Sequence, residues 1–424
     1  MKPHNIIELL SRIVKHHSEK PALIWRTHEK ERVYTYQQLW YQIHDVAYGL
    51  QKLGIQAGDK VAIYARSNPR AVICDLAILA LGGISVPIDP LRSKEQVYEL
   101  IQHADITSIL IENPGMLEEI QHLLPHMKHV ALLTGRSYHI GAVTFDTMVQ
   151  LGQTISNDAY QLPYPSIQQQ DPATMIYLFE NERIRALTYS HGNILQLIHS
   201  LSYLLPISVE DQFLSCLPYS CYIERLVGHF YPLLSGSSIS YLDSDKGLYP
   251  LNQTTFSTVC LQTPEFLQKL EQDLQKATPT NDTTFERIIP SKIRKGILDR
   301  FIKKATPKKW GEHLRCLIST KPLSCRFPTI EKQVQWAIFE LLGTEDCPVI
   351  AVGKHQENGE KVFTPLPSVD VRVSTDSVLL IKSQMIRIGE SCSDPDYESS
   401  MKNGWLSTGI PVTLTAKCHL QMQV

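Results

Sequence analysis

Residues 177–193 read Tyr-Leu-Phe-Glu-Asn-Glu-Arg-Ile-Arg-Ala-Leu-Thr-Tyr-Ser-His-Gly-Asn. The apolar run at 171–177 predicts a strand at the start of this stretch, and the helical spacing of apolar residues from Ile194 predicts a helix after it. A strand, a loop and a helix N-terminus form a geometry in which backbone N–H groups and the helix dipole bind phosphate. This order of elements predicts a phosphate-type loop at residues 178–189.

The residues at the loop position do not suit a phosphate. Such a loop needs glycines, because its backbone approaches the ligand closely and adopts positive φ in places. No glycine lies between Leu178 and Tyr189. Glu180 and Glu182 bring two carboxylates instead, and like charges a few ångströms apart repel by about 1 kcal/mol or more. We therefore expect the loop not to bind a triphosphate.

Strands and helices alternate along the chain before this stretch. A first helix, two short strands and a second helix are predicted at 5–17, 21–25, 32–36 and 35–53. Further strands are predicted at 58–65, 83–89, 106–111 and 129–133, with helices at 68–81, 95–103 and 116–124. Alternation at this spacing predicts an α/β fold with a doubly wound, mostly parallel sheet.

The frame from Asp171 to Tyr177, with Thr188 and His191-Gly-Asn, resembles the adenylate-forming (AMP-binding) superfamily of acyl-CoA synthetases, luciferases and peptide-synthetase adenylation domains. Residues 211–241 are similar to the long-chain fatty acyl-CoA synthetases in particular. That similarity is carried by Leu217-Pro-x-Ser, Ile223-Glu-Arg225 and Pro232-Leu-Leu-x-Gly236.

The resemblance extends over about residues 20–410 and implies the domain organisation. It implies an α/β core of two layered subdomains at 1–340, with the loop remnant at 177–193. A β-rich, barrel-like subdomain at 341–424 is implied after it, and the alternating apolar residues from Lys361 agree with a small β unit. The family's hinge and C-terminal lid, which supply a catalytic lysine, would follow Val424, so we expect the chain to lack them.

The resemblance also implies which residues are remnants of a nucleotide site. With one deletion, the family's loop lysine falls on Arg185, and Arg183 and Thr188 lie in the same frame. Thr344 and Glu345 match the positions that contact phosphate and magnesium. Arg185 and Glu345 are thus the only catalytic remnants. Glu345 is the only candidate metal ligand, but we prefer a capping or surface role for it, because magnesium sites need substrate phosphates as further ligands.

Two other family positions have changed. Leu342 stands where the family has its adenine-stacking tyrosine, and Ile410 stands where an aspartate binds the ribose hydroxyls. Loss of that charged acceptor would cost about 1.5–3 kcal/mol of binding free energy.

The similarity to long-chain synthetases implies three acyl-pocket candidates, Tyr219, Cys221 and Tyr222. Cys221 stands where the family has a histidine. The alternative is that the segment is an ordinary strand, helix and strand whose aromatic residues belong to the core, and we prefer this alternative for each residue considered singly.

Composition limits the partners. Lys and Arg total 41 against 43 for Asp and Glu, so no global charge attracts nucleic acid or anionic lipid. The nine cysteines contain no Cys-x-x-Cys pair and indicate buried, reduced thiols. No signal peptide and no apolar stretch of membrane-spanning length is present, so we expect a cytoplasmic protein without a transmembrane segment. The basic, amphipathic pattern at 292–315 suggests a membrane-surface or acidic-partner helix, although we prefer a solvated helix that covers the sheet.

Three functional hypotheses follow. The first is a catalytically inactive, acyl-CoA synthetase-like binding or interaction module for a long-chain acyl ligand, with no cofactor. The alternative is a diverged ATP-dependent fatty acid-adenylating enzyme that uses ATP and Mg²⁺ and is completed in trans by another chain. The third is a scaffold whose protein partner is a competent ligase, a lid domain or a carrier protein.

Overall fold

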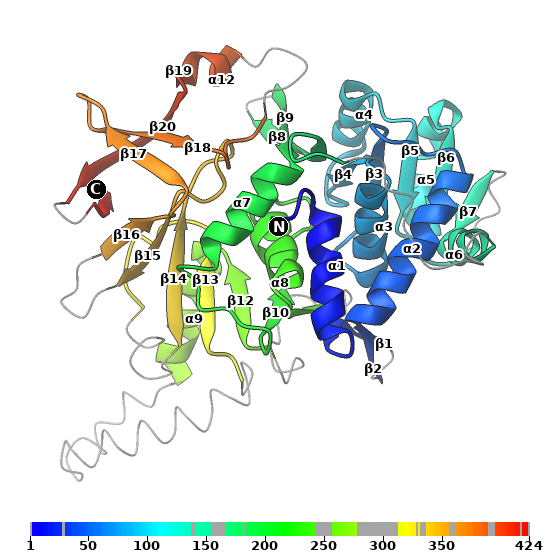
Figure 1. Ribbon diagram of the computed structural model, residues 1–424, viewed down its shortest axis with the longest axis horizontal. Helices are drawn as coiled ribbons and strands as arrows, with labels where there is room; N and C mark the ends of the chain where they lie inside the picture. The colour runs from blue at the N-terminus through cyan, green and yellow to red at the C-terminus, as the bar shows by residue number, and fades with distance from the viewer. Residues whose placement is uncertain are drawn as a thin grey trace, which may run out of the picture.

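The structure is a computed structural model with two β-sheets and helices between and outside them (Figure 1). It describes residues 2–27, 30–136, 141–154, 167–180, 183–241, 257–277, 313–327, 330, 336–355, 361–388, 395–415 and 418–422.

The smaller sheet has seven strands in the order β7-β6-β5-β3-β4-β8-β9. Neighbouring strands run parallel except for the pair β8 and β9. The strands are β3 Lys60–Tyr64, β4 Ile84–Ile88, β5 Ser108–Ile111, β6 His129–Leu132, β7 Ala142–Thr144, β8 Pro172–Glu180 and β9 Arg183–Ser190. Parallel neighbours need crossover connections. The helical ones are α3 Pro69–Ala80, α4 Lys94–Ala104, and α5 Pro114–Glu119 with the 3₁₀ segment η1 Gln121–His126.

The larger sheet has fourteen strands. Thirteen follow the path β17-β18-β20-β21-β16-β15-β14-β13-β12-β10-β11-β1-β2, and β19 pairs with β20 off this path. The strands from β1 to β14 on this path run parallel, whereas edge strand β2 and the strands beyond β14 run antiparallel. The first nine in sequence are β1 Pro21–Thr27, β2 Lys30–Thr35, β10 Gln212–Ser215, β11 Ser238–Tyr241, β12 Val259–Gln262, β13 Cys316–Ser319, β14 Ala337–Leu342, β15 Ala351–His355 and β16 Lys361–Pro365. The remainder are β17 Val369–Val373, β18 Val378–Ser383, β19 Met401–Lys402, β20 Trp405–Leu414 and β21 Leu420–Met422.

The first three helices each begin directly after a residue whose side chain caps the helix N-terminus. Asn5 caps α1 (Ile6–His17), and Asn68 caps α3, which has Pro69 at its first position. Thr35 and Gln38 form a reciprocal capping box at the start of α2 (Tyr36–Lys52). Each cap satisfies a backbone N–H group that has no partner inside its helix. These boundaries agree closely with those predicted from the sequence.

Strand residues alternate between three apolar cores. Val61 and Ile63 of β3 enter a central core with α1, α2 and α3, whereas Ala62 and Tyr64 face an outer core with α4 and α5. In the larger sheet, Phe213 enters the central core and its neighbour Leu214 faces a second outer core, which contains α9 (Pro264–Ala277). Because strand side chains alternate faces, the molecule has five layers of helix, sheet, helix, sheet and helix. The predicted doubly wound α/β class is confirmed.

The central helical layer also contains one helix that precedes strands β8 and β9 in the sequence and three helical elements that follow them. They are α6 Phe145–Gln153, α7 His191–Leu201, the π-helical segment η2 Glu224–Phe230 and α8 Tyr231–Leu234. The π-helical form of η2 is uncommon, and such segments are frequent at functional sites.

The C-terminal β unit differs in one respect from the barrel-like subdomain that the resemblance implied. Among the described residues, β15 to β21 form an open antiparallel path that continues the larger sheet, and no closed barrel is present. The implied boundary at residue 340 falls inside β14, which pairs with strands on both sides. The short helix α12 (Pro395–Ser400) precedes β19 at this end of the molecule.

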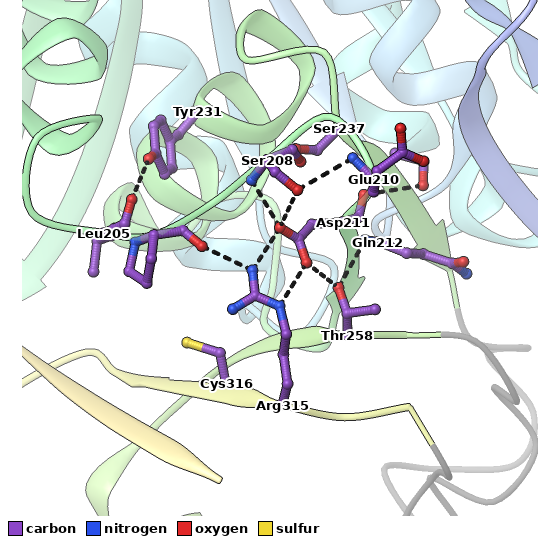
Figure 2. Close-up of polar contacts among 12 residues, drawn as sticks. Leu205, Ser208, Glu210, Asp211, Gln212, Tyr231, Ser237, Thr258, Arg315 and Cys316 are labelled. Atoms are coloured by element: carbon purple, nitrogen blue, oxygen red, sulfur yellow. Dashed lines mark hydrogen bonds and ion pairs between the residues drawn. The ribbon is translucent and has the colours of Figure 1, made fainter.

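Asp211 ties together the starts of three strands (Figure 2). Its carboxylate accepts hydrogen bonds from Nε and Nη2 of Arg315 at 2.9 and 2.6 Å and from the Thr258 hydroxyl at 2.6 Å. The backbone N–H and the hydroxyl of Ser208 donate as well, at 2.7 and 3.0 Å. Burial raises the pKa of Asp211, but these donors outweigh it, and the pKa lies below its usual value. A single aspartate thereby fixes where β10, β12 and β13 begin.

Three other expectations can be compared with the structure. Cys325 and Cys418 are exposed, which corrects the prediction that the cysteines are buried; Cys74, Cys260, Cys316 and Cys347 are buried. None of the helices that the structure describes is both long and apolar enough to cross a bilayer. The basic pattern at 292–315 lies almost wholly outside the described residues.

Candidate functional site

The stretch expected to form a loop is a β-hairpin. β8 and β9 pair without a gap from Thr174 opposite Tyr189 to Glu180 opposite Arg183. The predicted loop at 178–189 is therefore wrong, because all its described residues lie in strands. The physical reason is the absence of glycine. Alternating apolar residues such as Phe179 and Ile184 favour paired strands, and the ladder uses backbone groups that a phosphate loop would present to its ligand.

The N-terminus of α7 does not present N–H groups to an anion. Ser190 and Asn193 bond each other reciprocally, with the Ser190 N–H donating to Oδ1 of Asn193 at 2.9 Å and the Asn193 N–H donating to Oγ of Ser190 at 3.1 Å. The N–H groups of His191 and Gly192 donate to backbone carbonyls of the segment before β8, at 3.1 and 2.7 Å. The donors that a helix would offer to phosphate are thus already satisfied.

His191 has a structural role at this helix start. Its ring is fully buried, and its Nδ1 accepts a hydrogen bond from the backbone N–H of Ile6 at 3.3 Å. Burial lowers the pKa of His191 to about 4. The imidazole is therefore neutral at pH 7 and holds α1 against α7.

Asp346 lies between two arginines at the end of the hairpin. Its Oδ1 is 2.7 Å from Nε of Arg387 and 3.7 Å from Nη2 of Arg185, the residue at the family's lysine position. The Arg387 side chain is fully buried, whereas the side chains of Asp346 and Arg185 are 18% and 23% exposed. The guanidinium of Arg387 also stacks on the ring of Tyr397 at 4.2 Å. This cluster, Arg185–Asp346–Arg387, lies at the position where the resemblance implied a bound phosphate.

A short turn after β14 places the carboxylate of Asp346 next to the two arginines. The N–H of Thr344 donates to the Cys347 carbonyl at 3.0 Å, and the N–H of Cys347 donates to the Thr344 hydroxyl at 3.2 Å. Tyr189 donates its hydroxyl to the backbone carbonyl of Glu345. The sequence analysis selected Thr344 and Glu345 but missed Asp346, although it directly follows them. It missed Arg387 because no sequence motif marks that residue.

The remaining nucleotide-site remnants differ in exposure and in their contacts. Arg183 is exposed at the start of β9, and Glu345 is half-buried. Thr188 is buried and its carbonyl accepts from the N–H of Ile388 at 3.0 Å. Leu342 is a core residue at the end of β14, and Ile410 lies half-buried in β20. The side chain of Glu180 and residue Glu182 lie outside the described part of the chain.

The acyl-pocket candidates lie around η2. Tyr219 is 2% exposed and donates its hydroxyl to Oδ2 of Asp75 at 2.5 Å. Cys221 and Tyr222 are half-buried and pack against the central core. The hydroxyl of Tyr219 is thus hydrogen-bonded to a buried carboxylate inside the core. Acyl contact by these three residues stays a prediction.

Arg225 and Asp75 form a fully buried ion pair beside Tyr219. Nη2 of Arg225 lies 2.5 Å from Oδ1 of Asp75, and both side chains have no exposure. Nε of Arg225 donates to the Thr174 hydroxyl at 2.9 Å, which joins η2 to β8. Asp75 was missed by the sequence analysis, although a single aspartate inside the apolar helix at 68–81 indicates a buried charge that needs a partner.

Glu224, the first residue of η2, is a second buried acid beside Asp75 of α3. Ser215 donates its hydroxyl to Oε1 of Glu224 at 2.8 Å, and Nδ1 of His229 lies 3.6 Å from the same oxygen. Burial raises the pKa of Glu224 to about 8 and lowers that of His229 to about 3. Both side chains are therefore neutral at pH 7, and η2 carries one charge, on Arg225, in its buried interior.

The described donors at the hairpin differ from those of a phosphate-binding loop. Within the described residues, no cluster of three or more His, Cys, Asp or Glu side chains could hold a metal ion. The hairpin ladder and the caps of α7 engage the backbone N–H groups, and Arg185 faces a carboxylate. Among the described residues, a phosphate at Arg185 would compete with the carboxylate of Asp346.

Comparisons with known proteins agree with this architecture. The family model described as AMP-binding enzyme matches residues 10–177. Long-chain-fatty-acid--CoA ligase FadD15 of Mycobacterium bovis is 23% identical over 398 residues, which is 87% of this chain and 65% of that protein. The chloroplastic long-chain-fatty-acid--[acyl-carrier-protein] ligase AEE15 of Arabidopsis thaliana is 26% identical over 258 residues, covering 56% of this chain and 35% of that one.

Solved structures share the fold at low identity. A putative long-chain-fatty-acid CoA ligase from Rhodopseudomonas palustris superposes with a TM-score of 0.76 at 13% identity, covering 99% of this chain and 98% of that one. Residues 10–177 thus match an AMP-binding domain, and the chain is acyl-CoA synthetase-like, with the fold of the large domain of such enzymes, as its sequence motifs indicated. It spans 65% of the length of FadD15.

Proposed function

We propose that this chain is a non-catalytic member of its superfamily that binds a long-chain acyl ligand or a protein partner. The observation that carries this proposal is the Arg185–Asp346–Arg387 cluster at the end of a glycine-free hairpin. Adenylation needs positioned cations and N–H donors around the phosphates. Here the cation at the lysine position faces Asp346 across 3.7 Å, and the nearby N–H groups have protein partners.

The size of the expected loss supports inactivity. Removal of one such stabilising group typically lowers the rate by about a hundredfold or more. The glycine loop, the lysine and the ribose aspartate are all replaced in this sequence, and they serve one site. Their combined loss leaves little adenylation activity, even though losses within one site are not strictly additive.

The alternative is a diverged ATP-dependent fatty acid-adenylating enzyme completed in trans. One observation favours it. Two guanidinium groups, from Arg185 and Arg387, lie around one carboxylate, and such groups bind phosphate well. If Asp346 moved, the pair would suit a phosphate. A competent ligase, a lid domain or a carrier protein would then be the partner, and the name of AEE15 specifies a carrier protein for that relative.

Calorimetric titration tests the proposal. We expect no binding heat from millimolar Mg-ATP and measurable binding of palmitate presented below its aggregation limit. The matched variant Asp346→Ser removes the competing carboxylate and leaves both arginines. If ATP binds to this variant and not to the wild type, the carboxylate of Asp346 is what prevents ATP binding. Pyrophosphate exchange driven by any carboxylic acid, catalysed by the purified chain, would overturn the proposal and support the alternative.

A further inference from the structure

Two cysteine thiols lie in contact on one face of the larger sheet. Sγ of Cys216 is 3.6 Å from Sγ of Cys260, so that one thiol donates a hydrogen bond to the other. Cys260 is in β12, and Cys216 directly follows β10, the neighbouring strand (Figure 1). Among the described cysteines, no other two sulfurs are in such contact. Neither thiol was among the residues selected from the sequence.

The pairing of the strands brings the two thiols together. β10 and β12 run parallel, with Leu214 opposite Cys260. Residues opposite each other share one face of a sheet, and so does a residue two positions further along an extended chain. Leu214, Cys260 and Cys216 all contact the outer core that contains α9. The backbone pairing therefore places both thiols on the same face.

The two sulfurs are close to the distance of a disulfide. A disulfide joins two sulfurs at about 2.05 Å, so these two need to approach each other by about 1.5 Å. Cys260 is held within β12, and the carboxamide of Gln262 donates a hydrogen bond to its sulfur at 3.2 Å. Cys216 lies beyond the end of β10 and two positions past Leu214, the last residue that pairs with β12. Its backbone can therefore move toward Cys260 without breaking the ladder.

The two thiols differ in access. Cys216 is partly exposed and Cys260 is buried, so a reagent in solution reaches Cys216 first. The hydrogen bond with Cys260 and burial both raise the pKa of the Cys216 thiol well above its usual range. Because the thiolate is the reactive form, the pair reacts slowly at pH 7. The resting state is thus two thiols, and sustained oxidation is needed to change it.

We propose that Cys216 and Cys260 form a reversible disulfide when the chain is exposed to an oxidant of the low-molecular-weight disulfide class. The thiolate of Cys216 attacks one sulfur of this oxidant, whose S–S bond breaks and releases one thiolate. The sulfur of Cys260 gives up its proton and attacks Sγ of Cys216, which forms the new S–S bond and expels the second thiolate. Two protein thiols are oxidised, and one external disulfide is reduced to two thiols that take up the two protons.

The disulfide would tether the segment before η2 to β12. Cys216 is followed closely by the acyl-pocket candidates Tyr219, Cys221 and Tyr222. The two cysteines of the pair are 44 positions apart in the sequence. A cross-link over this length lowers the conformational entropy of the unfolded chain, whereas β10 and β12 are already neighbours in the fold. Oxidation should therefore stabilise the folded chain.

The test treats the purified full chain with oxidised glutathione at about pH 8, where more thiolate is present. Free thiols are then blocked with N-ethylmaleimide, and the digested chain is analysed by mass spectrometry without reduction. We expect a linked peptide pair that contains Cys216 and Cys260 and that disappears after dithiothreitol treatment. The oxidised chain should melt about 2 °C or more above the reduced chain.

Two variants separate this pair from the other thiols. Cys216→Ser removes the thiol that the oxidant reaches first, and it should abolish both the linked peptide and the rise in melting temperature. Cys418→Ser removes an exposed thiol outside the pair, and it should retain both. The linked peptide is measured on the wild-type chain, so the result does not depend on how well Cys216→Ser folds.

Several results would overturn the proposal. They are a glutathione adduct that persists on Cys216, a link between other cysteines in place of this one, and an unmodified Cys216 while the exposed Cys325 and Cys418 react. An equal rise in melting temperature for Cys216→Ser would also overturn it. None of these measurements uses ATP or palmitate, so failure here is distinguishable from failure of the proposed function.

Discussion

The β8–β9 hairpin and the segment from β10 to α8 both resemble ligase motifs, and they differ in how much polar chemistry they keep. At the hairpin, glycine and lysine positions are replaced, and the surviving cation, Arg185, is 23% exposed. In η2, Glu224 and Arg225 match the family and are fully buried. A buried charge without its partner costs several kcal/mol, so folding itself constrains η2. At the hairpin, only Arg387 is a fully buried charge, paired with Asp346, whereas the partly exposed Arg185 carries no such constraint and can change without loss of the fold.

The largest effect is expected from Arg225→Met. This change leaves Asp75 charged and buried without its partner, and breaking a buried pair on one side costs about 3–5 kcal/mol of unfolding free energy. Urea denaturation followed by circular dichroism measures the change. Arg12→Gln, which breaks the partly exposed pair with Glu8 on α1, is the matched control and should cost about 0.5 kcal/mol or less. Equal losses in the two variants would show that breaking the buried pair costs no more free energy of unfolding than breaking the partly exposed pair.

Asp211→Asn should have an intermediate effect. The change weakens the bonds from Arg315 and Thr258, and the expected loss is about 1–3 kcal/mol, since Arg315 is 42% exposed and water can solvate it. The pKa of Asp211 is lowered on folding, so its contribution is present above the unfolded value near 3.8 and is lost as pH falls through the folded pKa. The stability gap between wild type and variant should therefore close in acid. A gap that is constant down to pH 2 would refute this account.

Glu224→Gln should change the alkaline side of the pH profile. Folding raises the pKa of Glu224 from 4.5 to about 8, so the folded state holds a proton that the unfolded state has lost between these values. The contribution of Glu224 is therefore complete below pH 4.5 and is lost as pH rises through 8. Melting temperatures from pH 5 to 9 should fall less steeply for Glu224→Gln than for wild type. Parallel profiles would show that Glu224 is ionised in the fold.

The smallest effect is expected from Arg185→Gln. The pair with Asp346 is 3.7 Å long and partly exposed, and Arg387 still contacts Asp346. Such pairs contribute about 0–1 kcal/mol. Urea denaturation should give a loss within that range. A loss as large as that of Arg225→Met would contradict the distinction between the partly exposed Arg185–Asp346 pair and the buried Arg225–Asp75 pair.

Much of the fold could be predicted because its signals are local. The caps at Asn5, Thr35 and Asn68 and the apolar periods between them located the helices within a few residues. The hairpin was predicted wrongly for a related reason. The order of strand, loop and helix N-terminus predicted a loop at 178–189, whereas the absence of glycine and the alternating apolar residues favour paired strands.

The candidate site could be predicted only in part. Arg185, Thr344 and Glu345 were selected because they stand in motif frames. Asp346 and Arg387 were missed, since they come from separate parts of the chain and their pairing depends on how the turn after β14 faces the hairpin. Asp75 and Arg225 lie 150 residues apart and meet only when α3 packs against η2.

The sequence by itself determined the α/β class, the order of the elements and the loss of phosphate-binding residues. These follow from periodicity, caps and residue types, which act over a few positions. Only the tertiary structure decided that a carboxylate faces the remaining cation and that a buried ion pair joins η2 to α3. Those features depend on contacts between distant segments, whose free energy is realised only when the layers pack.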